Sequence, residues 1–217
     1  MLDARERVAE ASRRLADEGL VFGTAGNVSE RLDGLAAVTP TGAVLEGLTA
    51  EQVAVVDLEG QQVDGELEPT SELALHLGVY RQLGAGAVVH THAPMATALS
   101  CVLDELPVVH YNQLALGGSI RVARYETFGT ASLAEATLEA LEGRQAVLMA
   151  NHGAIASGQD VTAAVENALL LEWLCGVYWH ASALGTPRTL SAEQCQAVIE
   201  AAVGRRYGTT QRRSGTE

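Results

Sequence analysis

Hydrophobic and polar positions follow the periods of helices along much of the chain. Residues 3–18 carry apolar side chains at helical spacing and stop at Gly19, which predicts an amphipathic helix. A second helix is predicted over 70–83, with Thr70 or Ser71 as its cap and Glu72 in its first turn. Further helices are predicted in a short stretch from Pro94, at 132–141, at 161–184 and from Ser191.

Strands are predicted where apolar residues alternate or run together between turn residues. An Asp33-Gly34 pair separates 27–32 from 35–40 and is typical of a two-residue hairpin turn. The other predicted strands are 53–58, 61–67, 87–92, 121–125 and 146–151. Hairpins mixed with strand-helix-strand passages favour an α/β fold with a largely antiparallel sheet covered by helices on both faces.

Composition favours one globular domain over residues 1–217, of which 208–217 are expected to form a loose tail. Hydrophobic residues make up 47% and charged residues 19%, as in folded rather than disordered chains. Aromatic residues are only 4%, so we expect an aliphatic core. No apolar run approaches the length of a membrane span, and the first helix is too charged for a signal peptide. We therefore expect a soluble, cytoplasmic protein without a membrane partner.

The cysteines do not form the spacing of a disulfide framework or a zinc knuckle. Cys101, Cys175 and Cys195 are odd in number and lie far apart in apolar helical patterns. We expect all three to be buried free thiols.

The charged residues exclude several classes of function. A net charge of -13 argues against nucleic acid or an anionic membrane as partner. All 14 basic residues are arginine, so the chain offers no Schiff-base lysine, no pyridoxal-phosphate anchor and no P-loop lysine. Any carbonyl activation must come from a metal, an arginine or neutral hydrogen-bond donors.

Histidines in two short apolar segments are the clearest indication of chemistry. In VVHTHA, His90 and His92 are alternate residues of a predicted strand, so they project from the same face. His152 follows the apolar run AVLMA and precedes Gly153, at a sharp turn where we expect a close approach of backbones. Three imidazoles would hold a metal ion with an open position, as in catalytic sites. The alternative is that these are hydrogen-bonded core histidines.

Three small-residue segments predict a seat for a phosphate group. EPTSE places Glu72 at a helix start, where free backbone N–H groups favour an anion. GTAGN at 23–27 and TPTG at 39–42 add turns whose amides and hydroxyls, from Thr24, Asn27 and Thr41, can surround phosphate oxygens. The alternative is an ordinary capping box beside two ordinary turns.

Seven segments in order carry a resemblance to a known family: GTAGNVS, TPTG, PTSE, VVHTHA, HYNQLALGG, YETFGT and NHGAIASG. They resemble the class II aldolase and adducin family, over about residues 5–207. The resemblance implies an α/β/α three-layer sandwich with a mainly antiparallel central sheet. It also implies one Zn²⁺ per subunit, with Mn²⁺ or Co²⁺ as substitutes, and a cyclic homotetramer with active sites between subunits.

The resemblance assigns roles to individual residues. His90, His92 and His152 correspond to the metal ligands, and Glu72 to the general acid/base. Tyr111 corresponds to a tyrosine that protonates the aldehyde oxygen across the subunit interface. The phosphate-binding residues are Gly26, Asn27, Thr41, Gly42, Thr70 and Ser71, to which the turn itself adds Thr24, and the aldehyde pocket is expected at Phe128 and Tyr207. His76, His110 and His180 are expected to be structural.

The implied reaction is reversible cleavage of a ketose 1-phosphate, such as L-fuculose 1-phosphate, to dihydroxyacetone phosphate and a short aldehyde such as lactaldehyde. Glu72 would move the proton next to the carbonyl, and we expect its pKa to be displaced by the site. Asn151 departs from the family pattern and leaves the aldehyde preference open.

The same metal site also fits reactions other than aldol cleavage. Enzymes that share it are pentulose-phosphate 4-epimerases, sugar-phosphate dehydratases and decarboxylases. The resemblance also extends to non-catalytic, adducin-like interaction modules. From the residues alone, three histidines and a glutamate suit a metal-dependent hydrolase as well.

Overall fold

A nine-stranded mixed sheet forms the centre of the protein, in a computed structural model that describes residues 1–205. The expected tail at 208–217 and Tyr207 lie outside the described residues. The helices are α1 (Leu2–Asp17), α2 (Leu73–Leu83), α3 (Pro94–Ser100), α4 (Ala131–Leu141), α5 (Val161–Leu184) and α6 (Ala192–Arg205). Short 3-10 helices are η1 (Leu45–Gly47), η2 (Ala50–Gln52) and η3 (Tyr111–Leu116). The strands are β1 (Asn27–Leu32), β2 (Leu35–Val38), β3 (Ala54–Asp57), β4 (Gln62–Asp64), β5 (Ala87–Thr91), β6 (Glu105–Leu106), β7 (Ile120–Ala123), β8 (Ala146–Met149) and β9 (Gly153–Gly158).

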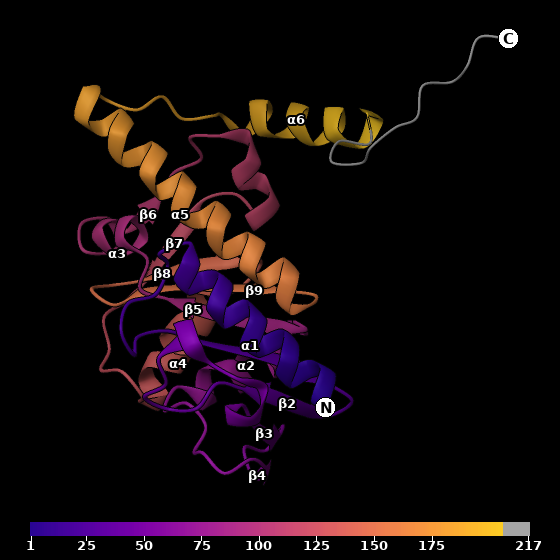
Figure 1. Ribbon diagram of the computed structural model, residues 1–217. Helices are drawn as coiled ribbons and strands as arrows, with labels where there is room; N and C mark the ends of the chain where they lie inside the picture. Colours follow the sequence, from indigo (N-terminus) through magenta and orange to yellow (C-terminus); the bar gives the residue numbers. More distant parts are fainter. Residues whose placement is uncertain (206–217) are drawn as a thin grey trace, which may run out of the picture.

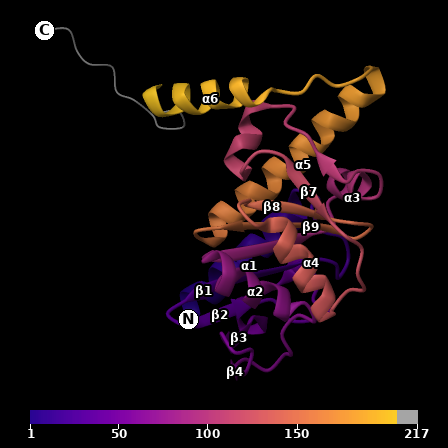
Figure 2. The same cartoon turned by 180° about the vertical axis from the view of Figure 1, so that it is seen from behind.

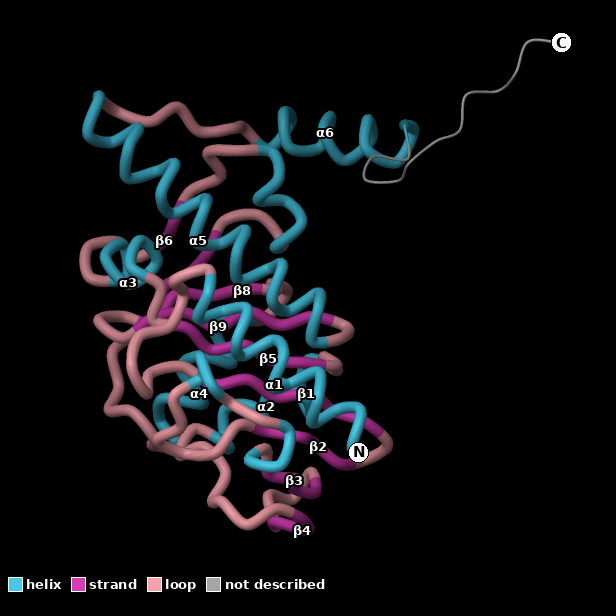
Figure 3. The backbone as a smooth tube through the Cα atoms, viewed as in Figure 1, coloured by secondary structure: helices cyan, strands magenta, loops and turns pink. Residues whose placement is uncertain are grey.

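The strands follow the order β4-β3-β2-β1-β5-β9-β8-β7-β6 across the sheet. Every neighbouring pair is antiparallel except β7 and β8, which are parallel. Helices α1 and α5 cover one face (Figure 1), and α2 and α4 cover the other (Figure 2). The expected three-layer α/β/α sandwich with a mainly antiparallel sheet is confirmed, and Figure 3 shows its three layers by type of element.

The β1–β2 hairpin forms where the Asp-Gly pair predicts it. Asp33 has a φ of 51° and Gly34 a φ of 82°, so both turn residues adopt left-handed backbone. This is the conformation of the two-residue turn that matches the twist of antiparallel strands. The hairpin fixes the register of β1, in which Asn27 lies opposite His90 of β5.

Alternate residues of the central strands supply two aliphatic clusters, one on each side of the sheet. Val28 and Val89 pack toward α1 and α5. Val88 and Ile155 pack toward α2 and α4. Each cluster is almost entirely Ala, Val, Leu and Ile, as the low aromatic content predicts.

Helix α2 starts later than the sequence indicates. Its N-cap is Glu72, whose side chain makes no capping hydrogen bond, so the expectation of a cap at Thr70 or Ser71 is wrong. The reason is an isolated bridge between Pro40 and Pro69, with the Thr70 amide donating to the Thr39 carbonyl at 3.0 Å. This bridge commits the Thr70 amide to the segment at 39–40 and brings the turn at 39–42 beside the start of α2.

Strand β9 is missing from the predicted elements. In its sequence GAIASG only Ile155 is a large branched side chain of the kind that favours strands, yet all six residues are buried. It pairs with β5 and β8 and thereby completes the centre of the sheet.

Helix α5 corrects the expectation that no apolar run approaches the length of a membrane span. Among the described residues it is the one helix long and apolar enough to cross a membrane by length and composition. It packs across β5 and β9, and residues such as Ala168 and Leu171 are buried there. A core helix that covers a sheet passes the same test, so the finding assigns no membrane contact.

The cysteines are free thiols, but only one is buried. Cys175 lies in the core, whereas Cys101 is exposed and Cys195 is partly exposed. The expectation of three buried thiols is therefore wrong for Cys101 and Cys195. Cys101 directly follows the short helix α3 at the surface, and α6, which carries Cys195, has no buried residue.

Candidate metal centre and phosphate pocket

The three predicted metal ligands converge at one end of the sheet. His90 lies in β5, His92 follows the end of that strand, and His152 lies in the turn between β8 and β9. Their ligand nitrogens all lie within 4.8 Å of one another. Asn151, with a φ of 55°, makes the left-handed turn that directs the chain back toward β5.

The hydrogen bonds of His90 show that a cation fits among these rings. Its Nδ1 lies 2.9 Å from the Ala154 carbonyl oxygen, which only accepts, so Nδ1 carries the hydrogen. Its Nε2 therefore presents a lone pair, 3.0 Å from Nε2 of His92 and 3.2 Å from Oε2 of Glu72. A neutral His92 can donate a hydrogen bond to that lone pair from its own Nε2–H. With both Nε2 atoms unprotonated, the two lone pairs and the carboxylate instead surround a place for a positive charge.

A proton is a poor candidate for that charge. Burial lowers the pKa of His92 to about 4, and burial also lowers the pKa of His152. Both rings are therefore neutral near neutral pH, which is the form that binds metals. A set of three imidazoles and one carboxylate fits a divalent metal ion with an open coordination position.

Glu72 is buried beside these histidines. Its Oε2 accepts a hydrogen bond of 2.9 Å from the Asn27 side-chain amide. Its Oε1 is buried, has no hydrogen-bond partner and lies 3.7 Å from Nε2 of His152. Burial raises the pKa of Glu72, but the neighbouring His90 and the Asn27 amide lower it, and the net pKa lies below its ordinary value. The expected displacement is therefore found, and its direction favours the carboxylate.

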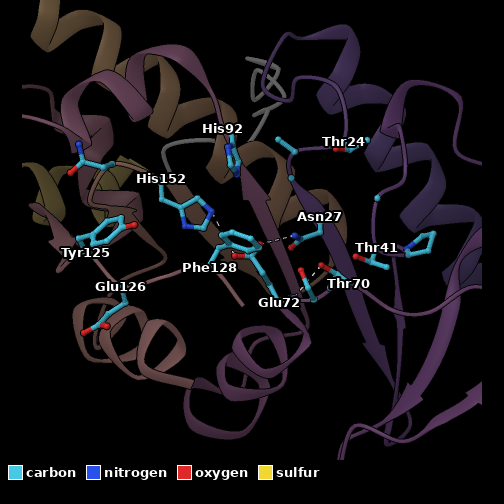
Figure 4. Close-up of a pocket in the computed structure, with 16 residues that line it drawn as sticks. Thr24, Asn27, Thr41, Thr70, Glu72, His92, Tyr125, Glu126, Phe128 and His152 are labelled. Atoms are coloured by element: carbon cyan, nitrogen blue, oxygen red, sulfur yellow. Dashed lines mark hydrogen bonds and ion pairs between the residues drawn. The ribbon is translucent and has the colours of Figure 1, made fainter. Parts of the chain in front are cut away.

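All predicted phosphate-binding residues line the same cavity, which has a volume of about 390 Å³ (Figure 4). They come from three segments: the turn before β1, the turn after β2 and the start of α2. Among the described residues that line it, none is an arginine. A phosphate there would be held by backbone amides and hydroxyls. The seven residues are Thr24, Gly26, Asn27, Thr41, Gly42, Thr70 and Ser71.

Gly26 allows the first of these turns to lie against β5. Its φ is 94°, in the left-handed region that favours glycine. A Cβ at this position would lie 2.7 Å from Cγ1 of Val21 and 3.0 Å from the backbone oxygen of His90. The glycine thus brings the turn close to the backbone of a metal-ligand candidate.

Of the described residues expected at the aldehyde end, only Phe128 lines the cavity. It is 71% exposed, so a substrate can cover it. Tyr111 does not line the cavity of its own chain; it stacks on His110 at the surface with an exposure of 41%. Within its own chain, Tyr111 therefore lies outside the cavity that the predicted phosphate-binding residues line. Tyr207 lies outside the described residues.

The cavity also contains residues that the sequence prediction missed. Tyr125 and Glu126 line it beside Phe128, and Asn151 lines it beside His152. Figure 4 shows Tyr125 and Glu126 on the side of the cavity away from the phosphate-binding turns. The segment YETFGT contains the first two, so their closeness to Phe128 in sequence was the available signal.

Gly153 is the close-approach residue that the sequence predicts, and replacing it with alanine tests the packing of the metal site. A Cβ there would lie 2.2 Å from the Thr91 backbone oxygen and 3.4 Å from Cε1 of His90. We expect Gly153→Ala to lower the free energy of unfolding by about 1–3 kcal/mol and to weaken metal binding, because β5 and β9 must separate. Denaturant unfolding and metal titration measure both.

The matched control for Gly153→Ala is Gly176→Ala in α5. The new Cβ would lie 3.8 Å from Met95, an ordinary contact, and alanine favours helix. We expect this control to be neutral or stabilising. Equal stability and metal affinity for Gly153→Ala and the wild type would contradict the close packing.

Known proteins resemble this chain over most of its length. The family model for the Class II Aldolase and Adducin N-terminal domain matches residues 6–179. The chain is 39% identical over 199 residues to the 5-methylthioribulose-1-phosphate/5-deoxyribulose-1-phosphate aldolase of Rhodospirillum rubrum, covering 90% of this chain and 89% of that relative. It is 40% identical over 185 residues to the L-fuculose phosphate aldolase of Escherichia coli K12, covering 84% and 86%.

The fold agrees with these similarities. A solved structure of L-fuculose 1-phosphate aldolase superimposes with a TM-score of 0.87 at 34% identity, covering 92% of this chain and 95% of that one. The three histidines that can hold a metal ion are those of the motifs that carry the resemblance. The chain therefore belongs to the class II aldolase and adducin family and is an enzyme of its metal-dependent aldehyde-lyases.

Proposed function

We propose that this enzyme is a zinc-dependent aldolase that reversibly cleaves a ketose 1-phosphate to dihydroxyacetone phosphate and a short aldehyde. The observation that carries the proposal is the cavity that His92, His152 and Glu72 share with the phosphate-binding turns, where His90 completes the group of three histidines. The Rhodospirillum rubrum relative and the enzyme of the solved structure above act on ketose 1-phosphates according to their names. Three nitrogen ligands favour zinc, while Mn²⁺ and Co²⁺ accept the same set.

Different residues of the site bind the phosphate, hold the cation and transfer the proton in such a cleavage. The turns that contain Gly26, Thr41 and Ser71 bind the phosphate through amides and hydroxyls and fix the sugar beside the histidines. The chemistry that a divalent cation supplies when bound is stabilisation of the negative charge that develops on substrate oxygens. Since Oε1 of Glu72 has no partner, that atom is available to hold and transfer a proton.

In the cleavage direction, the hydroxyl on carbon 4 loses its proton as the bond between carbons 3 and 4 breaks. We assign the acceptor of this proton to the deprotonated Tyr111 of a neighbouring subunit. Glu72, protonated from solvent beforehand, gives its proton to carbon 3, which completes dihydroxyacetone phosphate, and the tyrosine releases the proton that it took to solvent. In the synthetic direction Glu72 removes that proton, and the tyrosine returns its own to the new hydroxyl. Phe128 and Tyr125 form the apolar end of the cavity, where the short aldehyde would lie.

The test is incubation of the purified, zinc-loaded enzyme with L-fuculose 1-phosphate and, separately, with 5-deoxy-D-ribulose 1-phosphate. We expect dihydroxyacetone phosphate from both, with lactaldehyde from the first and acetaldehyde from the second. Chelator-treated enzyme is the control. Epimerisation of a pentulose 5-phosphate without cleavage of either ketose 1-phosphate would assign the chain to the epimerase branch. Dehydration or decarboxylation alone would likewise overturn the proposal.

The proposed assembly is a cyclic homotetramer whose active sites lie between subunits. Tyr111 is partly exposed, and α5 also exposes large apolar side chains at Trp173, Trp179 and Leu184. Large apolar side chains left exposed on one helix are available for burial against another subunit. The second half of α5 and all of α6 extend past the sheet in Figure 1, where a second subunit can reach them.

We further propose a cytoplasmic location for this enzyme. The support is the free thiols of Cys101, Cys175 and Cys195, since a reducing compartment keeps thiols free. The net charge of -13 supports the absence of nucleic acid among its partners.

A further inference from the structure

A column of buried polar groups runs between helix α2 and strand β1 and ends at Glu72. Asn27 and Ser29 are alternate residues of β1 and share one face, while Glu72, His76 and Tyr80 are spaced by four residues at the start and along α2. All five side chains are buried, and His76 and Ser29 have no exposed surface at all. The hydrophobic cluster on this side of the sheet is otherwise almost entirely aliphatic, so these polar side chains are surrounded largely by apolar ones.

Hydrogen bonds connect the members of this column in order. Tyr80 contacts the Ser29 hydroxyl through its own hydroxyl. The Ser29 Oγ lies 2.6 Å from Nδ1 of His76, and Nε2 of His76 lies 2.5 Å from Oδ1 of Asn27. The Asn27 amide nitrogen then reaches Oε2 of Glu72 at 2.9 Å.

The direction of every hydrogen bond follows from the carboxylate at the end. The Glu72 carboxylate only accepts, so Asn27 must present its NH₂ group to Glu72 and its carbonyl to His76. His76 therefore donates from Nε2 and accepts at Nδ1 from the Ser29 hydroxyl. Tyr80 consequently donates to Ser29.

The protonation states of the column agree with this direction. Burial lowers the pKa of His76 to about 4, so the ring is neutral and can accept at Nδ1. Burial raises the pKa of Tyr80 above its ordinary value, so the phenol keeps the hydrogen that it donates. All four donors thus point toward Glu72, and no polar atom in the column lacks a partner except Oε1 of Glu72.

We propose that His76 and Ser29 are positioning residues that orient the Asn27 amide, so that Oε2 of Glu72 is held and Oε1 alone exchanges protons with the substrate. A carboxylate with two equivalent free oxygens would rotate, and rotation would displace the proton-transfer atom. Outer groups that orient a catalytic group typically contribute about 10–100-fold to activity. The inference rests on the proposed function, because it names which atom of Glu72 moves the proton.

The main test compares His76→Leu with His76→Gln. Leucine removes both hydrogen bonds, whereas the Gln amide can still donate to Asn27 from about the position of Nε2. We expect His76→Leu to lower kcat about 10–100-fold with little change in KM, and His76→Gln to recover most of it. The same ranking is expected for deuterium exchange into dihydroxyacetone phosphate without aldehyde, which reports proton removal by Glu72 alone.

Ser29→Ala gives a milder variant in case His76→Leu folds poorly. It leaves His76 without its donor at Nδ1 and is expected to lower kcat and the exchange rate by a smaller factor than His76→Leu. Thr137→Val is the matched control, because it removes a buried hydroxyl in α4 that has no hydrogen-bond partner. It should leave both rates unchanged. Metal content should stay equal in all variants, since no histidine of the metal centre is altered.

A measurement independent of activity follows the side chain of Asn27 itself. Its amide protons should exchange slowly with solvent in the wild type and faster in Ser29→Ala and His76→Leu, as seen by nuclear magnetic resonance. If His76→Leu binds metal and retains wild-type kcat and deuterium exchange, the positioning role is wrong. A wild-type enzyme that neither exchanges dihydroxyacetone phosphate nor cleaves ketose 1-phosphates overturns the proposed function itself, and the inference with it.

Discussion

Glu72→Gln is expected to lower kcat about 10²–10⁴-fold while leaving the fold and metal content nearly unchanged. The amide has almost the same shape, and its carbonyl can still accept the hydrogen bond from Asn27. The atom that replaces Oε1 becomes an NH₂ group, which cannot take up a proton. Steady-state kinetics, metal analysis and thermal unfolding of the purified variant measure the three quantities.

The comparison for Glu72→Gln is Glu68→Gln, the same change four residues earlier in the chain. Glu68 is exposed and does not line the cavity, so its variant should keep wild-type kcat. Deuterium exchange into dihydroxyacetone phosphate should be lost in Glu72→Gln together with cleavage, because both need the same proton transfer. Full activity in Glu72→Gln would exclude the carboxylate as acid/base.

The parts of the site that follow from local rules were predictable from the sequence. Strand alternation places His90 and His92 on one face, and the two ring nitrogens indeed lie 3.0 Å apart. The Asp33-Gly34 turn fixes the β1–β2 hairpin through its own backbone preference. Neither result needs knowledge of the rest of the chain.

The meeting of distant segments depends on the order of strands, which no local pattern encodes. Asn27 reaches Glu72 because β1 lies between β2 and β5, and His152 reaches His90 because β9 pairs with β5. Strand β9 itself consists mostly of small residues, and the reason for their size lies in the close packing of neighbouring elements. A Cβ on Gly158 would lie 2.4 Å from the Ala164 backbone nitrogen, so the glycine permits the close approach of α5.

The contacts of His76 are a further example of what a local sequence pattern cannot predict. Its sequence context, an apolar helical pattern, favours a buried structural histidine, and it is fully buried. The pattern cannot show that its two ring nitrogens face Asn27 and Ser29 of a strand more than 40 residues away, at sequence separations of 49 and 47. The resemblance to the family supplied long-range information for the metal ligands, Glu72 and the phosphate-binding turns, but assigned no role to His76.

His92→Ala is expected to weaken binding of zinc by more than 100-fold and to reduce cleavage at low zinc by a similar factor. Loss of an outer hydrogen-bond partner of a metal ligand already costs about 10–100-fold in affinity, so loss of a ligand should cost more. His92 is the suitable choice because it lies at the cavity and is only partly buried, whereas His90 is fully buried. Zinc titration under competition with a chelator measures the affinity.

The stability of the metal-free protein separates this role from a structural one. Without a cation, Nε2 of His92 shares one hydrogen bond with Nε2 of His90, and His92 is only partly buried, so its removal should change the free energy of unfolding of the metal-free protein by only about 1 kcal/mol. Zinc at about 1,000 times its dissociation constant should stabilise the wild type by about 4 kcal/mol, and His92→Ala should lose most of this gain. His180→Ala, which alters an exposed histidine outside the cavity, should keep it. Equal zinc-dependent stabilisation in His92→Ala and His180→Ala would mean that the three rings do not bind the metal.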